Sequence, residues 1–186
     1  MMAITTLDPN TALILVDLQK GIVAKDTKPY PAAAVVAKAA RLAQAFRAHK
    51  LPVILVHVTG GAPGRNELPK PATPPADWAD LVPELDRQPD DHVVEKKSWG
   101  AFAHTGLDEH LRAQGVTQLV VAGIATAIGV ESTARQAYEA GFNVTLAIDT
   151  MTDLKAETHE NSVRHIFPRI GETGTAEDIM GLLDLR

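Results

Sequence analysis

Two charged residues at the ends of apolar runs are the first candidates for chemistry. Asp17 follows the apolar run 12–16, and Lys96 closes a shorter β-branched run. A carboxyl group beside apolar walls has a raised pKa, which suits a group that gives and takes a proton near neutral pH. Purely structural roles are open for both residues as well. An aspartate at a strand end commonly caps the next turn, and the adjacent pair Lys96 and Lys97 is typical of solvated surface charge.

A glycine inside a helical stretch is the third candidate. Gly129 falls in the first turn of a helix expected over 126–140, where alanine would be more favourable by about 1 kcal/mol. The amides of a first turn have no acceptor within the helix, so they can face the carbonyl or oxyanion of a ligand. A glycine lets such a ligand come close, although a glycine needed only for packing accounts for the residue equally well.

Alternating strands and helices must position these residues. Apolar β-branched runs predict buried parallel strands at 12–16, 53–58, 93–96, 118–122 and 143–148. Helical spacing of apolar residues predicts helices over 31–49, 107–114, 126–140, 154–165 and 177–183. Residues 165–170 are interpreted as a short sixth strand. The alternation favours a three-layer, Rossmann-like α/β fold, with a parallel sheet between helices, in a single domain over residues 1–186.

Composition excludes several classes of function. A formal net charge of −5 argues against nucleic acid or an anionic membrane as a partner. No apolar run approaches the roughly 20 residues that span a bilayer, and the first residues lack the features of a signal peptide. The chain has no cysteine, so it has no disulfide, no thiolate metal site and no thiol nucleophile. We expect a cytoplasmic protein.

The segment 59–91 is unusually long for a loop in a compact domain. It holds seven of the twelve prolines and also Trp78. Loops of this length are usually functional or disordered. We expect it to pack on a second copy of the chain, which predicts a homo-oligomer, or to form a lid. Trp78 and Trp99 are candidates for the walls of a pocket, although packing in a core or an interface is the commoner use of tryptophan.

The segment GIATAIGVESTARQAYEAGFNV resembles the signature of the isochorismatase-like, or cysteine hydrolase, superfamily. This superfamily includes nicotinamidases, N-carbamoyl amidases and isochorismatases, and the resemblance extends from VDLQ to HIFPRIGE. In the amidase branches the pattern reads G-[IV]-x-[TS]-x-x-C-V, and its cysteine is the nucleophile. The cysteine position is Gly129 in this chain.

The resemblance implies a fold and a set of site residues. It implies six parallel strands in the order 3-2-1-4-5-6 and a cis peptide between Ile124 and Ala125. Asp17 corresponds to the acid–base aspartate, and Lys96 to its partner lysine. Strands 1 and 3 would be two spacings apart, roughly 10 Å, so the loop after Lys96 must curl back for this pair to form. The remaining candidates for an oxyanion hole or for substrate binding are Ala125, Gly129, Gln19, Trp99 and Phe102.

The missing thiol directs the expected reaction. Amide hydrolysis in this superfamily requires the thiolate, whereas the isochorismatase branch cleaves a vinyl ether and requires an acid. The resemblance therefore implies a small-molecule hydrolase in which Asp17 donates a proton. An anionic dicarboxylate such as isochorismate also needs cations, for which Lys96, Lys97 and Arg65 are candidates. Two alternatives are a catalytically silent binding protein of the same fold and an amidase inactivated by a Cys→Gly change.

We expect no metal and no cofactor. Nicotinamidases hold a metal through an Asp-x-His pair after the second strand. The corresponding segment here reads His57-Val58-Thr59, and the next histidine is His92.

Overall fold

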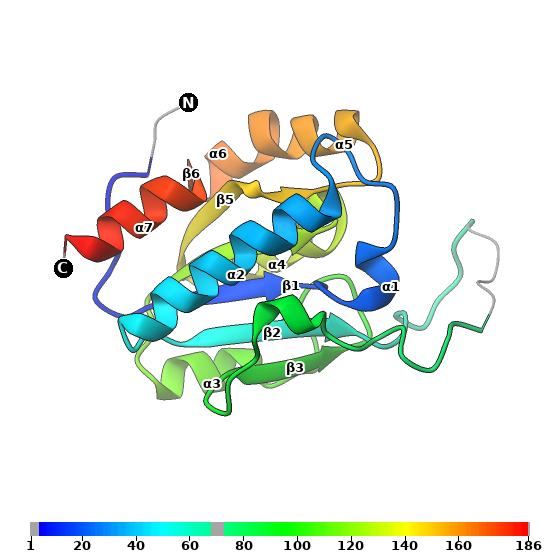
Figure 1. Ribbon diagram of the computed structural model, residues 1–186, viewed down its shortest axis with the longest axis horizontal. Helices are drawn as coiled ribbons and strands as arrows, with labels where there is room; N and C mark the ends of the chain where they lie inside the picture. Colours follow the sequence, from blue (N-terminus) through cyan, green and yellow to red (C-terminus); the bar gives the residue numbers. More distant parts are fainter. Residues whose placement is uncertain (1–3, 68–72, 186) are drawn as a thin grey trace.

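Six strands form one parallel sheet with the order β3-β2-β1-β4-β5-β6 (Figure 1). The computed structural model describes residues 4–67 and 73–185. All five strand pairs are parallel, which confirms the predicted fold class and strand order. The strands are β1 (Thr11–Val16), β2 (Val53–Val58), β3 (His92–Lys96), β4 (Gln118–Ile124), β5 (Asn143–Thr152) and β6 (Glu172–Gly174).

Helices connect the strands and cover both faces of the sheet. The α-helices are α1 (Lys20–Val23), α2 (Ala32–Ala48), α3 (Leu107–Ala113), α4 (Glu131–Glu139), α5 (Ala156–Asn161), α6 (Phe167–Ile170) and α7 (Ala176–Asp184). A 3-10 turn covers Pro83–Leu85, and π-helical turns cover Thr126–Val130 and Ser162–Ile166. None of the helices in the described ranges is long and apolar enough to cross a membrane.

The central strand β1 is buried on both faces, and its side chains alternate between two cores. Leu13 and Leu15 belong to the core beneath α2 and α7, which lie together on one face in Figure 1. Ile14 and Val16 belong to the core beneath α3 and α4 on the opposite face. Each fully buried side chain of this size contributes roughly 1.5–3 kcal/mol. Because β1 is held on both sides, the residue that follows it has a well-defined position.

The predicted strand over 165–170 is wrong, since these residues are helical. A π-helical turn over Ser162–Ile166 continues into α6, and β6 follows at Glu172–Gly174. Val163, Phe167 and Ile170 are buried in the core beneath α4, and their spacing is helical. Pro168, which has no amide hydrogen, falls in the first turn of α6, directly after the π-helical turn.

Candidate active site

Asp17 and Lys96 form a buried ion pair at the carboxyl edge of the sheet. The ammonium Nζ of Lys96 donates a hydrogen bond to Asp17 Oδ2 over 2.8 Å. The Lys96 side chain is 1% exposed and that of Asp17 is 8% exposed. Asp17 directly follows β1 with a left-handed φ of 55°, a conformation that aspartate tolerates better than most residues. The chain therefore turns away from the sheet at Asp17, and the Asp17 side chain stays at the end of β1.

The loop after β3 folds back over Lys96. The carbonyls of Ser98 and Trp99 accept hydrogen bonds from Lys96 Nζ over 3.1 Å and 3.0 Å. An ammonium group has three hydrogens, so these two carbonyls and the Asp17 carboxylate occupy all of them. The loop therefore curls back as the ion pair requires, and Lys96 is fully committed to holding the loop and Asp17.

Helix α4 ties this loop to the turn that carries Gly129. Thr133 Oγ1 accepts a hydrogen bond from the Ala101 amide over 3.1 Å and donates one to the Gly129 carbonyl over 2.7 Å. The Phe102 amide donates to Gln136 Oε1 over 3.1 Å. Two side chains of one helix thus fix the loop against the β4–α4 connection.

Burial raises the pKa of Asp17 to about 6. The largest cause is the removal of water from the carboxyl group, and Lys96 and His57 oppose it by favouring the carboxylate. Oδ2 accepts from Lys96, whereas Oδ1 is buried without a hydrogen-bond partner among the described residues. A buried oxygen without a partner is costly as part of a carboxylate and can carry a proton to a ligand.

Gly129 lies directly against Asp17, within the π-helical turn Thr126–Val130. A Cβ atom at Gly129 would stand 2.9 Å from Asp17 Oδ2 and 3.0 Å from Val16 Cγ1. The first of these distances is shorter than real Cβ contacts allow. The Asp17 carboxyl group can therefore take its position only because Gly129 has no side chain. Single π-helical turns are frequent at functional sites.

The backbone before this turn contains the expected cis peptide between Ile124 and Ala125. Asp153, at the end of β5, accepts a hydrogen bond from the Ala127 amide over 2.7 Å and from the Leu154 amide over 2.7 Å. One amide of the turn is therefore already paired with a carboxylate. The assignment of the Ala125 and Gly129 amides to an oxyanion hole stays a prediction.

A cavity of about 280 Å³ opens next to the ion pair. Asp17, Lys96, Ala125, Gly129 and Trp99 all line it, so the structure brings five of the seven predicted site residues together. Trp99 is 65% exposed and stands at its mouth. The other lining residues are Ile22, Lys25, Val58, Gly60, Gly61, Trp78, Ser98, Ile124, Ile128 and Leu154.

Gln19 and Phe102, which we expected to bind substrate, do not line this cavity. Gln19 is fully buried. Its side-chain amide donates a hydrogen bond to the Val58 carbonyl at the end of β2 and accepts one from the Val58 backbone amide, and it also donates to the Trp78 carbonyl. Phe102 packs against Phe142 with ring centroids 6.0 Å apart. Gln19 therefore supports the cavity wall, and Phe102 anchors the loop that follows Lys96.

The segment around Trp78 docks on the chain itself and forms part of the cavity. The Trp78 carbonyl accepts a hydrogen bond from the Gly21 amide, and its indole ring covers Gly21 so closely that a Cβ there would lie 1.8 Å from the ring. Lys20 pairs with Asp77 and Asp80. This part of the proline-rich segment thus covers α1 like a lid.

Lys25 is a lining residue that the sequence did not single out. It follows α1, and nothing in the pattern of α1 indicates that this lysine faces a cavity at the carboxyl edge. Lys97 and Arg65, the cations suggested by the sequence, are absent from the lining. Lys97 instead lies 3.9 Å from Glu95.

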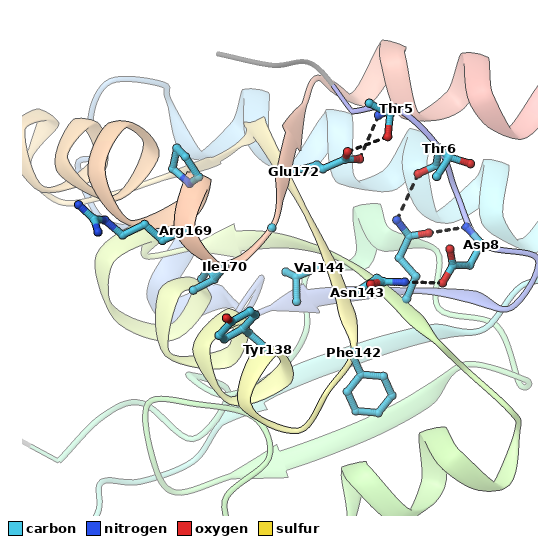
Figure 2. A pocket seen from close by; sticks show the side chains of 13 residues that line it. Thr5, Thr6, Asp8, Tyr138, Phe142, Asn143, Val144, Arg169, Ile170 and Glu172 are labelled. Carbon is cyan, nitrogen blue, oxygen red and sulfur yellow. Dashed lines mark hydrogen bonds between the residues drawn. The ribbon is translucent and has the colours of Figure 1, made fainter.

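A second cavity, of about 400 Å³, lies at the opposite edge of the sheet (Figure 2). Gln118, at the start of β4, donates to the Thr6 carbonyl and accepts from the Asp8 amide. Asp8 also accepts from Asn143, and Glu172 accepts from Thr5. These polar groups form hydrogen bonds with one another and hold the start of the chain in place, so we interpret their role as structural.

Across residues 4–67 and 73–185, no group of three or more histidine, aspartate and glutamate side chains is placed to hold a metal ion.

A family model, related sequences and solved structures all match this chain to the same family. The family model "Isochorismatase domain" matches residues 11–178. The isochorismatase family protein YwoC of Bacillus subtilis is 42% identical over 178 residues, covering 91% of this chain and 92% of YwoC. A solved isochorismatase family protein from Burkholderia thailandensis superposes with a TM-score of 0.93 at 42% identity, over 98% of this chain and 100% of that one. The ureidoacrylate amidohydrolase RutB of Variovorax paradoxus is 34% identical over 102 residues, covering 54% of this chain and 40% of RutB.

Proposed function

The chain belongs to the isochorismatase family of hydrolases, and on that premise we propose that it cleaves a vinyl ether such as isochorismate by acid catalysis at Asp17. The observation that supports this most is the state of Asp17. One oxygen is held by Lys96, the other is buried and unpartnered among the described residues, and Asp17 itself lines the cavity.

The arrangement suits a general acid. With a pKa of about 6, roughly a tenth of Asp17 is protonated at pH 7, and more than half of it is protonated below pH 6. Oδ1 carries the proton, because Oδ2 accepts the hydrogen bond from Lys96. Gly129 has no side chain that would push the Asp17 carboxyl group out of its place beside Lys96.

The reaction then follows from proton transfer. Asp17 gives its proton to the methylene carbon of the vinyl ether, and the electron pair of the double bond forms the new C–H bond. The neighbouring carbon becomes part of an oxocarbenium ion, to which water adds while the Asp17 carboxylate takes up a proton. The resulting hemiketal loses its alcohol by cleavage of the ether C–O bond. The products are pyruvate and the hydroxyl form of the remaining molecule.

Amide hydrolysis is the less well supported function. The chain has no cysteine, and by the resemblance of its sequence to the amidase signature Gly129 corresponds to the position of the amidase nucleophile. An aspartate and a lysine that are bound to each other supply no comparable covalent nucleophile. A member that binds a small molecule without turnover remains the second candidate, because Asp17 and Lys96 would form the same buried pair in it.

Pyruvate release from isochorismate, coupled to lactate dehydrogenase, tests the proposal. Asp17→Asn keeps the shape of the side chain but cannot donate a proton as an acid, so kcat should fall by about 10²–10⁴-fold. Asp90→Asn makes the same change of charge on an exposed residue ahead of β3 and should leave the rate unchanged. Unchanged pyruvate release by Asp17→Asn, or robust amidase activity in the wild type, would refute the proposal. Turnover of neither substrate class would favour the binding protein.

A further inference from the structure

The positive charge of Lys96 is not available to a ligand. Its three hydrogens bind Asp17 Oδ2 and the carbonyls of Ser98 and Trp99, and its side chain is 1% exposed. A substrate anion would have to displace one of these acceptors to gain a hydrogen bond from Lys96. A charged substrate must therefore find its counter-charge elsewhere in the cavity.

Lys25 is the other cation among the described residues that line the cavity. It is exposed, and it forms no ion pair with any residue in the described ranges. The neighbouring carboxylate of Asp26 lies 3.2 Å from Lys28 instead. A lysine without an ion-pair partner among the described residues thus lines the same cavity as Asp17.

The remaining walls are mostly apolar. The larger apolar side chains that line the cavity are Ile22, Trp78, Trp99, Ile124, Ile128 and Leu154. A volume of about 280 Å³ is close to the lower limit of the roughly 300–1,000 Å³ that is usual for small-molecule sites. The described part of the cavity wall therefore combines an uncommitted cation, a buried carboxyl oxygen and apolar side chains around a compact space.

From this arrangement we propose that Lys25 binds the anionic group of the substrate and so selects a compact anion with an apolar body. Lys25 supplies the positive charge that the committed ammonium group of Lys96 cannot, so one anionic group of the substrate lies at the Lys25 end of the cavity. The reacting part of the molecule then lies at the Asp17 end. This inference rests on the proposed function only in taking the cavity as the substrate site, and it holds for any reaction at Asp17.

Intrinsic fluorescence gives a direct measure of binding. The chain has two tryptophans, Trp78 and Trp99, and both line the cavity. Cyclohexanecarboxylate and its neutral counterpart cyclohexanecarboxamide have the same ring and do not absorb at the excitation wavelength of tryptophan. Titration of the wild type with each compound should show that the carboxylate binds about tenfold more tightly, as expected for one partly solvated ionic hydrogen bond.

Three variants assign the preference to Lys25. Lys25→Met should remove the tenfold preference for the carboxylate, and Lys25→Arg should retain most of it because the charge remains. Lys50→Met is the matched control, since Lys50 is exposed ahead of β2 at the opposite edge of the sheet. Equal binding of the two compounds by the wild type, no fluorescence response to either one, or an undiminished preference in Lys25→Met would each overturn the inference.

The same measurements distinguish a failure of the Lys25 anion site from a failure of the vinyl-ether reaction. A carboxylate preference that depends on Lys25, with no cleavage of isochorismate, would support the anion site and refute the vinyl-ether reaction. Pyruvate release with a KM that Lys25→Met leaves unchanged would do the reverse. If both proposals hold, Lys25→Met should raise the KM for isochorismate about tenfold, with a smaller change in kcat.

Discussion

Lys96 Nζ lies 2.8 Å from Asp17 Oδ2, although the strands that position these residues are not neighbours. Strand β2 separates β1 from β3, so the Lys96 side chain must reach across the end of β2. It does so beneath the backbone of Ser98 and Trp99, which shields the pair from water. A buried ion pair with water excluded is a weak source of stability but an effective way to perturb a pKa. The geometry therefore suits chemistry better than support of the fold.

The pH dependence of the reaction should follow the protonation of Asp17. An acid acts only in its protonated form, and burial raises the pKa of Asp17 to about 6. We expect kcat/KM for isochorismate to be highest below pH 6 and to fall about tenfold per pH unit well above it. Steady-state rates between about pH 5 and 8.5 measure this profile. A rate that stays constant up to about pH 8 would show that Asp17 is not the acid.

Removal of the lysine should move this profile. Lys96 favours the Asp17 carboxylate and so lowers its pKa against the effect of burial. In Lys96→Met the pKa should therefore rise further, and the falling limb of the profile should shift to higher pH. The same shift is not expected for Lys50→Met, whose lysine is remote from the site. A limb that stays in place would contradict the coupling of Asp17 and Lys96.

The free energy of unfolding should also depend on the interaction between Asp17 and Lys96. Truncating one partner of a buried ion pair typically costs about 3–5 kcal/mol, because the other charge is left unpaired. Asp17 can escape this cost by protonation at low pH, so the loss of unfolding free energy in Lys96→Met should be smaller at about pH 5 than at about pH 8. Urea unfolding at the two pH values measures the difference. An equal loss at both would point to the broken loop contacts of Ser98 and Trp99 as the whole cause.

The parts of the site that the sequence predicted are those set by the ends of strands. Asp17 and Lys96 close apolar runs, and parallel strands bring their carboxyl ends to one edge. Lys25 and the docking of Trp78 on Gly21 depend on tertiary contacts between segments far apart in the chain, which no local pattern encodes. The same limit applies to Gln19, whose partners Val58 and Trp78 could not be identified from its position after β1.

We still propose a homo-oligomer, but for a different reason than the proline-rich segment. The segment around Trp78 packs on the chain's own α1 and so gives no reason for a partner. Trp99 and Leu154, which both line the cavity, are 65% and 42% exposed, and a second chain that covered them would bury this apolar surface. We expect light scattering at micromolar concentration to give a multiple of 19.9 kDa. A mass of one chain would refute the homo-oligomer.

Gly129 should tolerate no side chain, whether or not that side chain is a thiol. A Cβ atom there would stand 2.9 Å from Asp17 Oδ2, so Asp17 would have to move from its place beside Lys96. Overpacking of this kind typically costs about 1–3 kcal/mol of unfolding free energy. Gly129→Ala and Gly129→Cys should therefore both be destabilised and should both release pyruvate more slowly than the wild type.

Gly181→Ala is the matched control for this change. Gly181 lies in α7, and apart from its chain neighbours and the backbone of its own helix no described atom lies within 4 Å of the position that a Cβ would take there. Alanine should therefore raise stability by about 0.5–1 kcal/mol through helix propensity alone. The thermal unfolding midpoint should rise in Gly181→Ala and fall in Gly129→Ala, and pyruvate release should be unchanged only in Gly181→Ala. Fast amide hydrolysis by Gly129→Cys at wild-type stability would show that the site still accommodates a cysteine nucleophile, and that the contact between Gly129 and Asp17 does not constrain the chemistry.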